Sequence, residues 1–186
     1  MFARTDRLLL RPGWKEDAPA LAAAVNTLGL ARNLDGPPWP YTAADAEAFL
    51  AEANADPART TLLAYRRTAG APELVGAVGL ARTGEGQALF AAWTARPHWG
   101  EGYASEAGAA LLDIARHGLR LGHVFAWSFL DNPAGGRFLG KLGFRPTGEI
   151  VRAPSLARAG AGRPCRLHVR ALGAAAAPDP AEALAA

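Results

Sequence analysis

The sequence has 186 residues, of which 50% are apolar and 20% charged, and its formal net charge is +3. This length fits one domain with a full core, and no apolar run approaches the roughly 20 residues that span a bilayer. The arginines are scattered, whereas a nucleic-acid partner would require a continuous basic stripe. The single cysteine, Cys165, excludes an internal disulfide, and the first residues show no secretory leader. We therefore expect a soluble cytoplasmic protein that binds neither nucleic acid nor membrane, and the charge still permits a small anionic ligand.

The first half of the chain predicts two helices and then an antiparallel meander of strands. Apolar residues recur at helical spacing over 17–28, and the prolines of 36–41 exclude a helix there. Thr42, followed three residues later by Asp45, resembles an N-cap that opens the second helix. Turns rich in Gly or Pro separate the strands. In chain order we expect a strand at 8–11, a helix over 17–28, a loop over 36–41, a helix over 42–53, and strands at 61–66, 74–82 and 87–94.

The second half predicts a strand–helix–strand crossover, the connection that a parallel strand pair requires. Apolar residues form one stripe along 103–119, and Gly143 ends the later helix. The expected elements are a helix over 103–119, a strand at 123–129, a helix over 133–142, and strands at 145–152 and 166–172. The fold class is therefore α/β, with a mixed sheet, in one domain over 1–172. The Ala/Pro-rich tail 173–186 lacks large apolar residues, so we expect it to be disordered or a loosely attached helix.

One candidate functional motif is the turn between the strand that ends at Thr94 and the helix that begins at Tyr103. It contains Gly100 and Gly102. Such a turn presents backbone N–H groups at a positive helix terminus, and glycine lets a phosphate approach closely. A Gly-x-Gly before a helix is, however, often only a tight turn.

A second motif covers 131–144, directly after the strand at 123–129. Asn132 is placed as an N-cap, with Pro133 at the first helical position. This structural role does not exclude a contact between Asn132 and a ligand.

These two motifs together resemble the GNAT superfamily of acetyltransferases, and most closely the branch that acetylates ribosomal-protein N-termini. The acetyl-CoA loop of that family, Q/R-x-x-G-x-G/A, corresponds to Trp99-Gly100-Glu101-Gly102-Tyr103-Ala104. The Asn-x-x-Ser and Lys-Leu-Gly-Phe signature is matched by Asn132 and by 141–144. The likeness extends from 5–12 through Phe144.

The resemblance implies a mixed sheet with helices on both faces, in which the strand at 87–94 splays from the strand at 123–129. The pantetheine arm of acetyl-CoA would lie between these two strands, bonded to the backbone of Thr94 and Ala95 and touched by Asn132. Arg137 and Lys141 would pair with phosphates, although each also fits a solvated helix face. The implied cofactor residues are Trp93, Thr94, Ala95, Trp99, Gly100, Glu101, Gly102, Tyr103, Ala104, Ser105, Asn132, Arg137 and Lys141.

The catalytic groups of the family cannot be carried over to this sequence. The serine expected three residues after Asn132 is Gly135, and the tyrosine of other branches falls on Leu139. Apolar residues fill 89–92, where relatives often carry an acidic residue. His98 is a weak candidate for the base, because a lone loop histidine is more often a bystander.

The acceptor is read from irregular segments and aromatic residues. The loop 37–41 and the segment 155–164 are expected to border it, and Trp39, Tyr41 and Trp127 could line it or belong to the core. The four histidines lack metal-ligand spacing, so we expect no metal.

The sequence thus predicts acetyl-CoA-dependent N-acetylation of a primary amine, on a protein N-terminus or a small molecule. Two other interpretations stay open at this point. One is a non-catalytic acyl-CoA-binding module; the other is a Rossmann nucleotide-binding protein, although the third fingerprint glycine is missing. A homodimer is compatible with the sequence.

Overall fold

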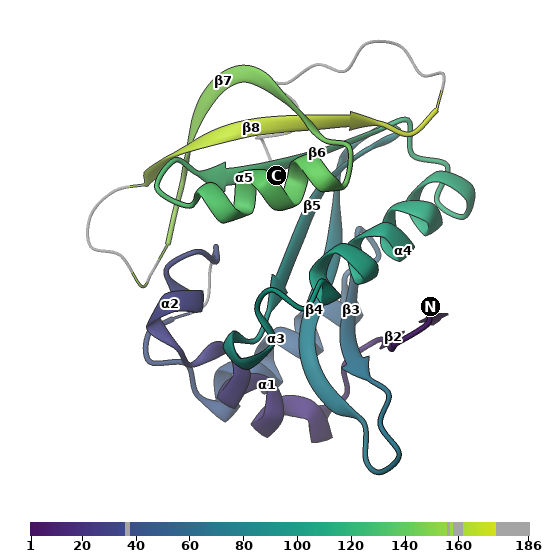
Figure 1. The fold of residues 1–186 in the computed structure, drawn as a ribbon, viewed down its shortest axis with the longest axis vertical. Coiled ribbons are helices and arrows are strands. Elements are labelled where there is room, and N and C mark those ends of the chain that lie inside the picture. The colour runs from purple at the N-terminus through teal and green to yellow at the C-terminus, as the bar shows by residue number, and fades with distance from the viewer. Residues whose placement is uncertain (36–37, 156, 158–161, 174–186) are drawn as a thin grey trace.

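The computed structural model describes residues 1–35, 38–155, 157 and 162–173, and shows one mixed sheet covered by helices on both faces (Figure 1). The eight strands lie in the order β1-β2-β3-β4-β5-β6-β8-β7. They are β1 (Ala3–Arg4), β2 (Leu8–Arg11), β3 (Arg59–Arg66), β4 (Glu73–Gly84), β5 (Gln87–Thr94), β6 (His123–Phe129), β7 (Arg145–Ala153) and β8 (Arg163–Ala171). All neighbouring strands are antiparallel except β5 and β6, which are parallel. The predicted fold class is therefore confirmed.

The helices pack on the two faces of this sheet. The 3₁₀ turn η1 (Lys15–Asp17), α1 (Ala18–Val25), α2 (Leu28–Ala31) and α3 (Ala43–Ala55) precede β3, and the 3₁₀ turn η2 (Arg96–His98), α4 (Tyr103–His117) and α5 (Pro133–Lys141) follow β5. Side chains of α4 and α5 share one apolar core with β2 to β6. Those of α1 and α3 share a second core with β3 and β4.

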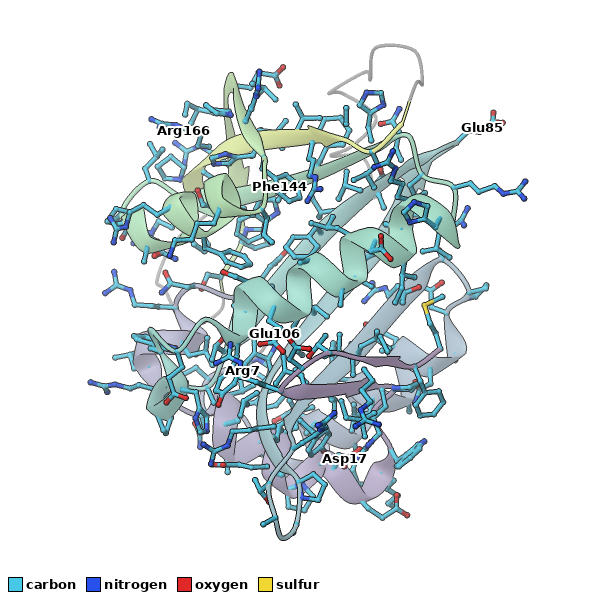
Figure 2. The ribbon with its side chains drawn as sticks, turned by 45° about the vertical axis from the view of Figure 1, so that its right-hand side comes forward. Arg7, Asp17, Glu85, Glu106, Phe144 and Arg166 are labelled. Carbon is cyan, nitrogen blue, oxygen red and sulfur yellow. The ribbon has the colours of Figure 1, made fainter. Side chains whose placement is uncertain are left out.

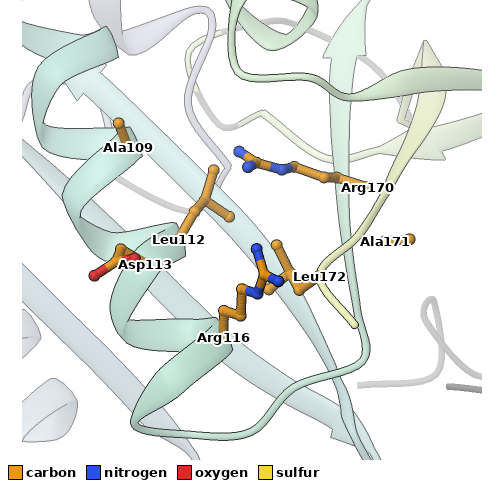
Figure 3. Close-up of a pocket in the computed structure, with 7 residues that line it drawn as sticks. All are labelled: Ala109, Leu112, Asp113, Arg116, Arg170, Ala171 and Leu172. Atoms are coloured by element: carbon orange, nitrogen blue, oxygen red, sulfur yellow. The ribbon is translucent and has the colours of Figure 1, made fainter. Parts of the chain in front are cut away.

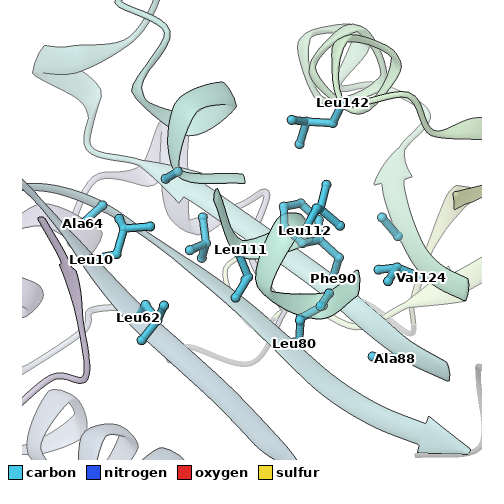
Figure 4. Packing of buried hydrophobic residues seen from close by; sticks show 14 of the residues in the cluster. Leu10, Leu62, Ala64, Leu80, Ala88, Phe90, Leu111, Leu112, Val124 and Leu142 are labelled. Atoms are coloured by element: carbon cyan, nitrogen blue, oxygen red, sulfur yellow. The ribbon is translucent and has the colours of Figure 1, made fainter. Parts of the chain in front are cut away.

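The core beneath α4 is the largest apolar cluster (Figure 4). Leu111 and Leu112 of α4 are 0% and 1% exposed and meet Phe90 and Leu142 there. Burying a side chain of this size contributes about 1.5–3 kcal/mol. The packing therefore holds α4 firmly over β5, and with it the turn that leads into the helix.

The structure corrects the single helix predicted over 17–28. Asn26 has φ −73° and ψ 49°, and Thr27 is extended, so α1 ends at Val25 and α2 begins at Leu28. The side chain of Asn26 accepts a hydrogen bond from the Tyr41 backbone N–H at 3.4 Å. An Asn side chain competes with helical hydrogen bonds, and the apolar spacing does not reveal that competition.

The remaining boundaries differ little from the predicted ones. β5 and β6 have the predicted bounds, whereas the two-residue β1 was not predicted and β8 begins three residues earlier than expected. Of the predicted tail, 174–186 lies outside the described residues, as do 36–37 of the predicted loop and 156 and 158–161 of the segment expected near the acceptor.

The parallel pair diverges along its length. Its register contains Gln87 with His123, Ala88 with Val124, and Leu89 with Phe125. Beyond these pairs β6 continues beside β8 as far as Phe129, and β5 continues beside β4 as far as Thr94. The carboxyl-terminal halves of β5 and β6 are thus each bonded to one neighbour and separate from each other, which is the splay that the resemblance implied.

Candidate functional site

The turn between β5 and α4 ends in a helix N-terminus with free backbone donors. Gly100 and Gly102 both have φ +84°, a conformation that glycine adopts without the strain of a Cβ. Gly102 is the N-cap of α4, and no described side chain caps this terminus. The first-turn N–H groups of Tyr103, Ala104 and Ser105 therefore have no intrahelical acceptor. Together with the helix dipole they form a place for an anion.

His98 anchors this turn to the start of β4. Its Nε2 lies 3.1 Å from Oε1 of Glu73 and its Nδ1 lies 3.7 Å from Oε1 of Glu101. Its ring meets Tyr103 edge-on at 5.9 Å, and the residue is 8% exposed. Both ring nitrogens therefore face carboxylates, which favours a positioning role over the catalytic one considered from sequence.

Arg7 clamps the same turn from the N-terminal hairpin, a contact that no sequence motif indicated. Its Nη1 donates to the Glu101 carbonyl at 3.0 Å, and its Nε lies 2.7 Å from Oε2 of Glu106. The guanidinium also lies 4.5 Å from the centre of the Tyr103 ring. Figure 2 shows Arg7 and Glu106 meeting at the first turn of α4.

Glu106 is consequently held as a carboxylate. Burial alone would raise its pKa, but hydrogen bonds from Thr5 and from the backbone and side chain of Arg7 outweigh burial and lower the pKa. The positive end of the α4 dipole stabilises an ionised Glu106, and the charge of Arg7 balances that of Glu106.

The backbone at the end of β5 already has partners within the chain. The Thr94 carbonyl accepts a hydrogen bond from Nε1 of Trp99 at 2.7 Å. The Ala95 N–H donates to the Val75 carbonyl at 2.8 Å, and the Ala95 carbonyl accepts from the His98 N–H at 2.9 Å. A ligand would therefore share the carbonyls with these donors, since each carbonyl oxygen has two lone pairs.

A shallow depression, too small to admit a water molecule, lies beside these groups. It is lined by Trp93 and Thr94 of β5, by Tyr103 and Ala104 of α4, and by apolar residues of β3 and β4. The structure thus brings together most of the predicted cofactor residues around the first turn of α4.

The second motif forms the N-terminus of α5, at the divergent end of β6. Asn132 caps the helix, because its Oδ1 accepts from the Gly135 N–H at 3.2 Å. Arg137 and Lys141 are exposed along α5. Gly135 has no positive φ, and a Cβ there would lie 3.1 Å from Nδ2 of Asn132 and 3.4 Å from Cβ of Ser128.

Sequence reasoning missed Ser128 and His168, which lie beneath this helix terminus. Ser128 is 9% exposed and His168 5%, and their side chains are 3.2 Å apart. The strand alternation offered a signal, because a polar residue follows Val124 and Ala126 on the face of β6 that packs in the apolar core beneath α5.

The aromatic residues proposed for the acceptor occupy different environments. Trp39 is 40% exposed, whereas Tyr41 is 6% exposed and packs in the core of α1 and α3, where burial raises its pKa to about 12. Trp127 stacks edge-on against Phe129 at 5.2 Å, on the side of the sheet opposite α5. Trp39 is therefore exposed and Trp127 partly exposed, so both stay candidates for the acceptor site. Tyr41 is a core residue.

Helix α2 lies beside the turn that precedes α4 and beside the end of β6. A Cβ at Gly29 would lie 3.6 Å from the Trp99 ring, and Arg32 pairs with Asp131 at 3.2 Å. Ser155, between β7 and β8, donates to the Arg32 carbonyl at 3.3 Å. These contacts bring α2, the 131 turn and part of the predicted acceptor segment together.

A separate cavity lies near the other end of α4 (Figure 3). Its volume is about 160 Å³, and Asp113, Arg116 and Arg170 line it. Arg170 is already committed to the Leu142 carbonyl at 2.6 Å. This cavity shares no lining residue with the site at the first turn of α4.

Two further features of the described residues bear on function. None of their helices combines the length and apolar character of a membrane span. No three of their His, Cys, Asp or Glu side chains gather into a metal-binding cluster.

Comparison with known proteins supports the assignment of the fold and family. No curated protein matches the sequence, but the family model described as an acetyltransferase (GNAT) domain matches residues 7–145. A GNAT-family acetyltransferase from Bacillus anthracis is similar in structure, with TM-score 0.79, 20% identity, and coverage of 92% of this chain and 99% of the other.

Two other solved structures with a similar fold are named by substrate. RimL, a ribosomal L7/L12 α-N-protein acetyltransferase solved with coenzyme A, has TM-score 0.77 and 17% identity over 92% of this chain and 98% of its own. Spermidine N-acetyltransferase from Vibrio cholerae, solved with CoA and spermine, has TM-score 0.75 and 19% identity over 90% and 97%. The match of the family model over most of its length shows that this chain belongs to the GNAT acetyltransferase family.

Proposed function

We propose that this chain is an acetyl-CoA-dependent N-acetyltransferase that acetylates a primary amine, with a protein N-terminal α-amine as the preferred acceptor. The observation that carries the proposal is the divergence of β5 and β6 beside the uncapped N-terminus of α4. In this arrangement the thioester would lie between the strands, with its pyrophosphate at the helix terminus.

The residues present fit such a cosubstrate. The first-turn N–H groups of α4 suit a pyrophosphate. The edge of β5 that faces away from β4 does not pair with β6 beyond Leu89, and this edge suits the pantetheine arm. Arg137 and Lys141 are exposed on α5 and would supply positive charge for further phosphates. Solved members of the same fold contain CoA.

The expected reaction is direct attack of a neutral amine on the thioester carbonyl. Holding both reactants in place accounts for much of the rate, and backbone donors can polarise the carbonyl. A cysteine thiol has an ordinary pKa of about 8.5, and a thiolate of this kind leaves with only moderate help from a proton donor.

The acceptor preference follows from the state of the nearby carboxylates. Glu73 and Glu101 face His98, and Glu106 is paired with Arg7. None of these three carboxylates is therefore free to act as a strong base toward the acceptor amine. Deprotonating an α-amine of pKa about 7.8 at pH 7 costs roughly 1 kcal/mol, whereas a lysine of pKa about 10.4 costs roughly 4.6 kcal/mol. A site with weak base assistance therefore favours the α-amine.

The acceptor would enter from the side of the sheet opposite α4 and α5, past Trp39, Trp127 and α2. We place the enzyme in the cytoplasm and its domain over 1–172. A reducing compartment suits its single cysteine, which is buried.

The decisive experiment measures thiol release from acetyl-CoA with a panel of amines. The panel contains peptides with a free α-amine, the same peptides blocked at that amine but carrying lysine, and a polyamine. We expect release with the free α-amine peptides. If the chain binds acetyl-CoA but no amine of the panel causes thiol release, it is instead a non-catalytic acyl-CoA-binding module.

A further inference from the structure

Ser128 and His168 form a buried polar pair for which the fold itself offers no structural reason. Ser128 Oγ lies 3.2 Å from Nε2 of His168, and the two residues come from the neighbouring strands β6 and β8. Buried polar groups usually complete their hydrogen bonds. Nδ1 of His168, however, is buried without a hydrogen-bond partner among the described residues. An incompletely satisfied pair of this kind in a core requires an explanation.

The pair lies on the part of the sheet beside which the proposed function places the thioester. Ser128 is three residues beyond the last β5–β6 pair at Phe125, on the divergent part of β6. A Cβ at Gly135 would lie 3.4 Å from Cβ of Ser128, and one at Gly136 would lie 3.8 Å from its Oγ. The Ser128 hydroxyl therefore lies beneath the first turn of α5, beside the position that carries serine in the resembling branch and glycine here.

The free nitrogen of His168 indicates how the hydrogen atoms are arranged. A buried N–H without an acceptor is rarer in proteins than an acceptor without a donor, so the proton belongs on Nε2. Burial and the charge of Arg166 lower the pKa of His168, which keeps the ring neutral at pH 7. Nε2–H then donates to Ser128 Oγ, and the serine O–H is left to donate elsewhere.

On the basis of the proposed function, we propose that Ser128 is the catalytic residue that protonates the departing thiolate, and that His168 is its positioning residue. When the amine nitrogen bonds to the acetyl carbon and the C–S bond breaks, the electron pair of that bond goes to sulfur. Sulfur takes the proton of the Ser128 hydroxyl, and Ser128 takes the proton that the acceptor nitrogen releases, directly or through water. The products are the amide and the free thiol, and the serine ends as it began.

The test exchanges the position of the hydroxyl. Ser128→Ala should lower kcat on the order of 10²-fold, at the lower end of what positioned acid catalysis contributes, with acetyl-CoA affinity unchanged. Gly135→Ser in the Ser128→Ala background should restore most of the loss, because the added Cβ lies against Ser128 and only the Asn132 amide must shift slightly. Gly135→Ser alone should add little. Thr147→Val is the control, since it removes a hydroxyl that bonds the Leu167 carbonyl of β8.

The role of His168 is tested by substitutions that keep or remove its N–H donor. His168→Gln keeps an N–H near the position of Nε2 and should retain kcat, whereas His168→Leu should lower kcat and leave the acetyl-CoA KM unchanged. If His168 had only a structural role, His168→Leu should retain a higher kcat than His168→Gln, because leucine suits an apolar core better than glutamine.

The outcomes separate this inference from the proposed function. If the wild-type enzyme acetylates amines and Ser128→Ala retains full kcat, the role of Ser128 is refuted and the proposed function stands. A Ser128→Ala defect that Gly135→Ser does not restore also refutes the role as proton donor. If the wild-type chain binds acetyl-CoA but acetylates no amine, both proposals fail.

Discussion

The indole Nε1 of Trp99 donates a 2.7 Å hydrogen bond to the carbonyl oxygen of Thr94, the last residue of β5. This bond joins the middle of the turn that precedes α4 to the end of β5, and it occupies one lone pair of a carbonyl that the GNAT resemblance assigns to acetyl-CoA. The exposed indole therefore organises the turn from outside, since Trp99 itself is 50% exposed.

Trp99→Phe should weaken acetyl-CoA binding moderately. The substitution removes the donor and keeps an aromatic ring beside Gly29, so the loss should equal one neutral hydrogen bond, about 0.5–1.5 kcal/mol. That corresponds to roughly a 2- to 13-fold higher Kd, measurable by titration calorimetry. An unchanged Kd would show that the turn is held by Arg7 and His98 alone.

Gly102→Ala should impair acetyl-CoA binding more than Gly100→Ala does. Both glycines have φ +84°, so either substitution adds strain of about 1–2 kcal/mol and should lower the melting temperature similarly. Only Gly102 caps α4, where a Cβ would lie 3.6 Å from Nη2 of Arg7. Equal losses of affinity in the two variants would contradict a phosphate position at this helix terminus.

Asp17→Asn should destabilise the fold at neutral pH by about 2 kcal/mol. Burial would raise the pKa of Asp17, but hydrogen bonds from Arg11, the Trp14 N–H and Tyr65 hold it at about 2 against an ordinary 3.8. A lowered pKa of nearly two units corresponds to this energy. The side chain is only 10% exposed, so solvent screens the interaction little.

The stability that Asp17 contributes should disappear on acidification. It is fully present above pH 3.8 and is lost as the pH falls through about 2. Urea unfolding of the wild type and of Asp17→Asn, at pH 7 and near pH 2, measures the difference in their free energies of unfolding. This difference should become small near pH 2. Glu47→Gln is the control, because its ion pair with the 78% exposed Lys15 side chain is worth at most about 1 kcal/mol. A difference that persists at pH 2 would contradict the assigned charge.

Trp39→Ala should raise the acceptor KM and leave the acetyl-CoA Kd nearly unchanged. Trp39 is 40% exposed in the segment after α2, whereas Tyr41 is buried nearby and should respond to Tyr41→Ala mainly by a loss of stability. Steady-state kinetics with an α-amine peptide and thermal unfolding separate the two effects. If Trp39→Ala lowers stability as Tyr41→Ala does, Trp39 belongs to the core.

The pH profile of kcat/KM should follow the acceptor and not the enzyme. With a peptide α-amine the rate should rise and level off near pH 7.8, and with a lysine-type amine it should rise toward about pH 10.4. Two acceptors of different pKa measured on the same enzyme provide the comparison. One shared midpoint for both acceptors would reveal an enzymatic general base.

The sequence alone determined the order of most elements and the position of the turn before α4. The glycines before Tyr103 and the Asn132-Pro133 start of α5 are local signals, because they reflect backbone conformations that few other residues adopt. For this reason β5 and β6 were predicted with correct bounds. The break between α1 and α2 was not, because an Asn26 contact to a residue 15 positions away decides it.

Only the tertiary structure decided which side chains meet at the site. The sequence makes His98 a candidate base, whereas in the fold its Nε2 faces Glu73, 25 residues away. Arg7 reaches Glu106 across 99 residues, and Ser128 reaches His168 across 40. Such contacts depend on strand register and helix packing, which have no local signature in the residues that make them. The turn before α4 is thus encoded in local backbone geometry, whereas the proposed proton donor exists only because β6, β8 and α5 pack together.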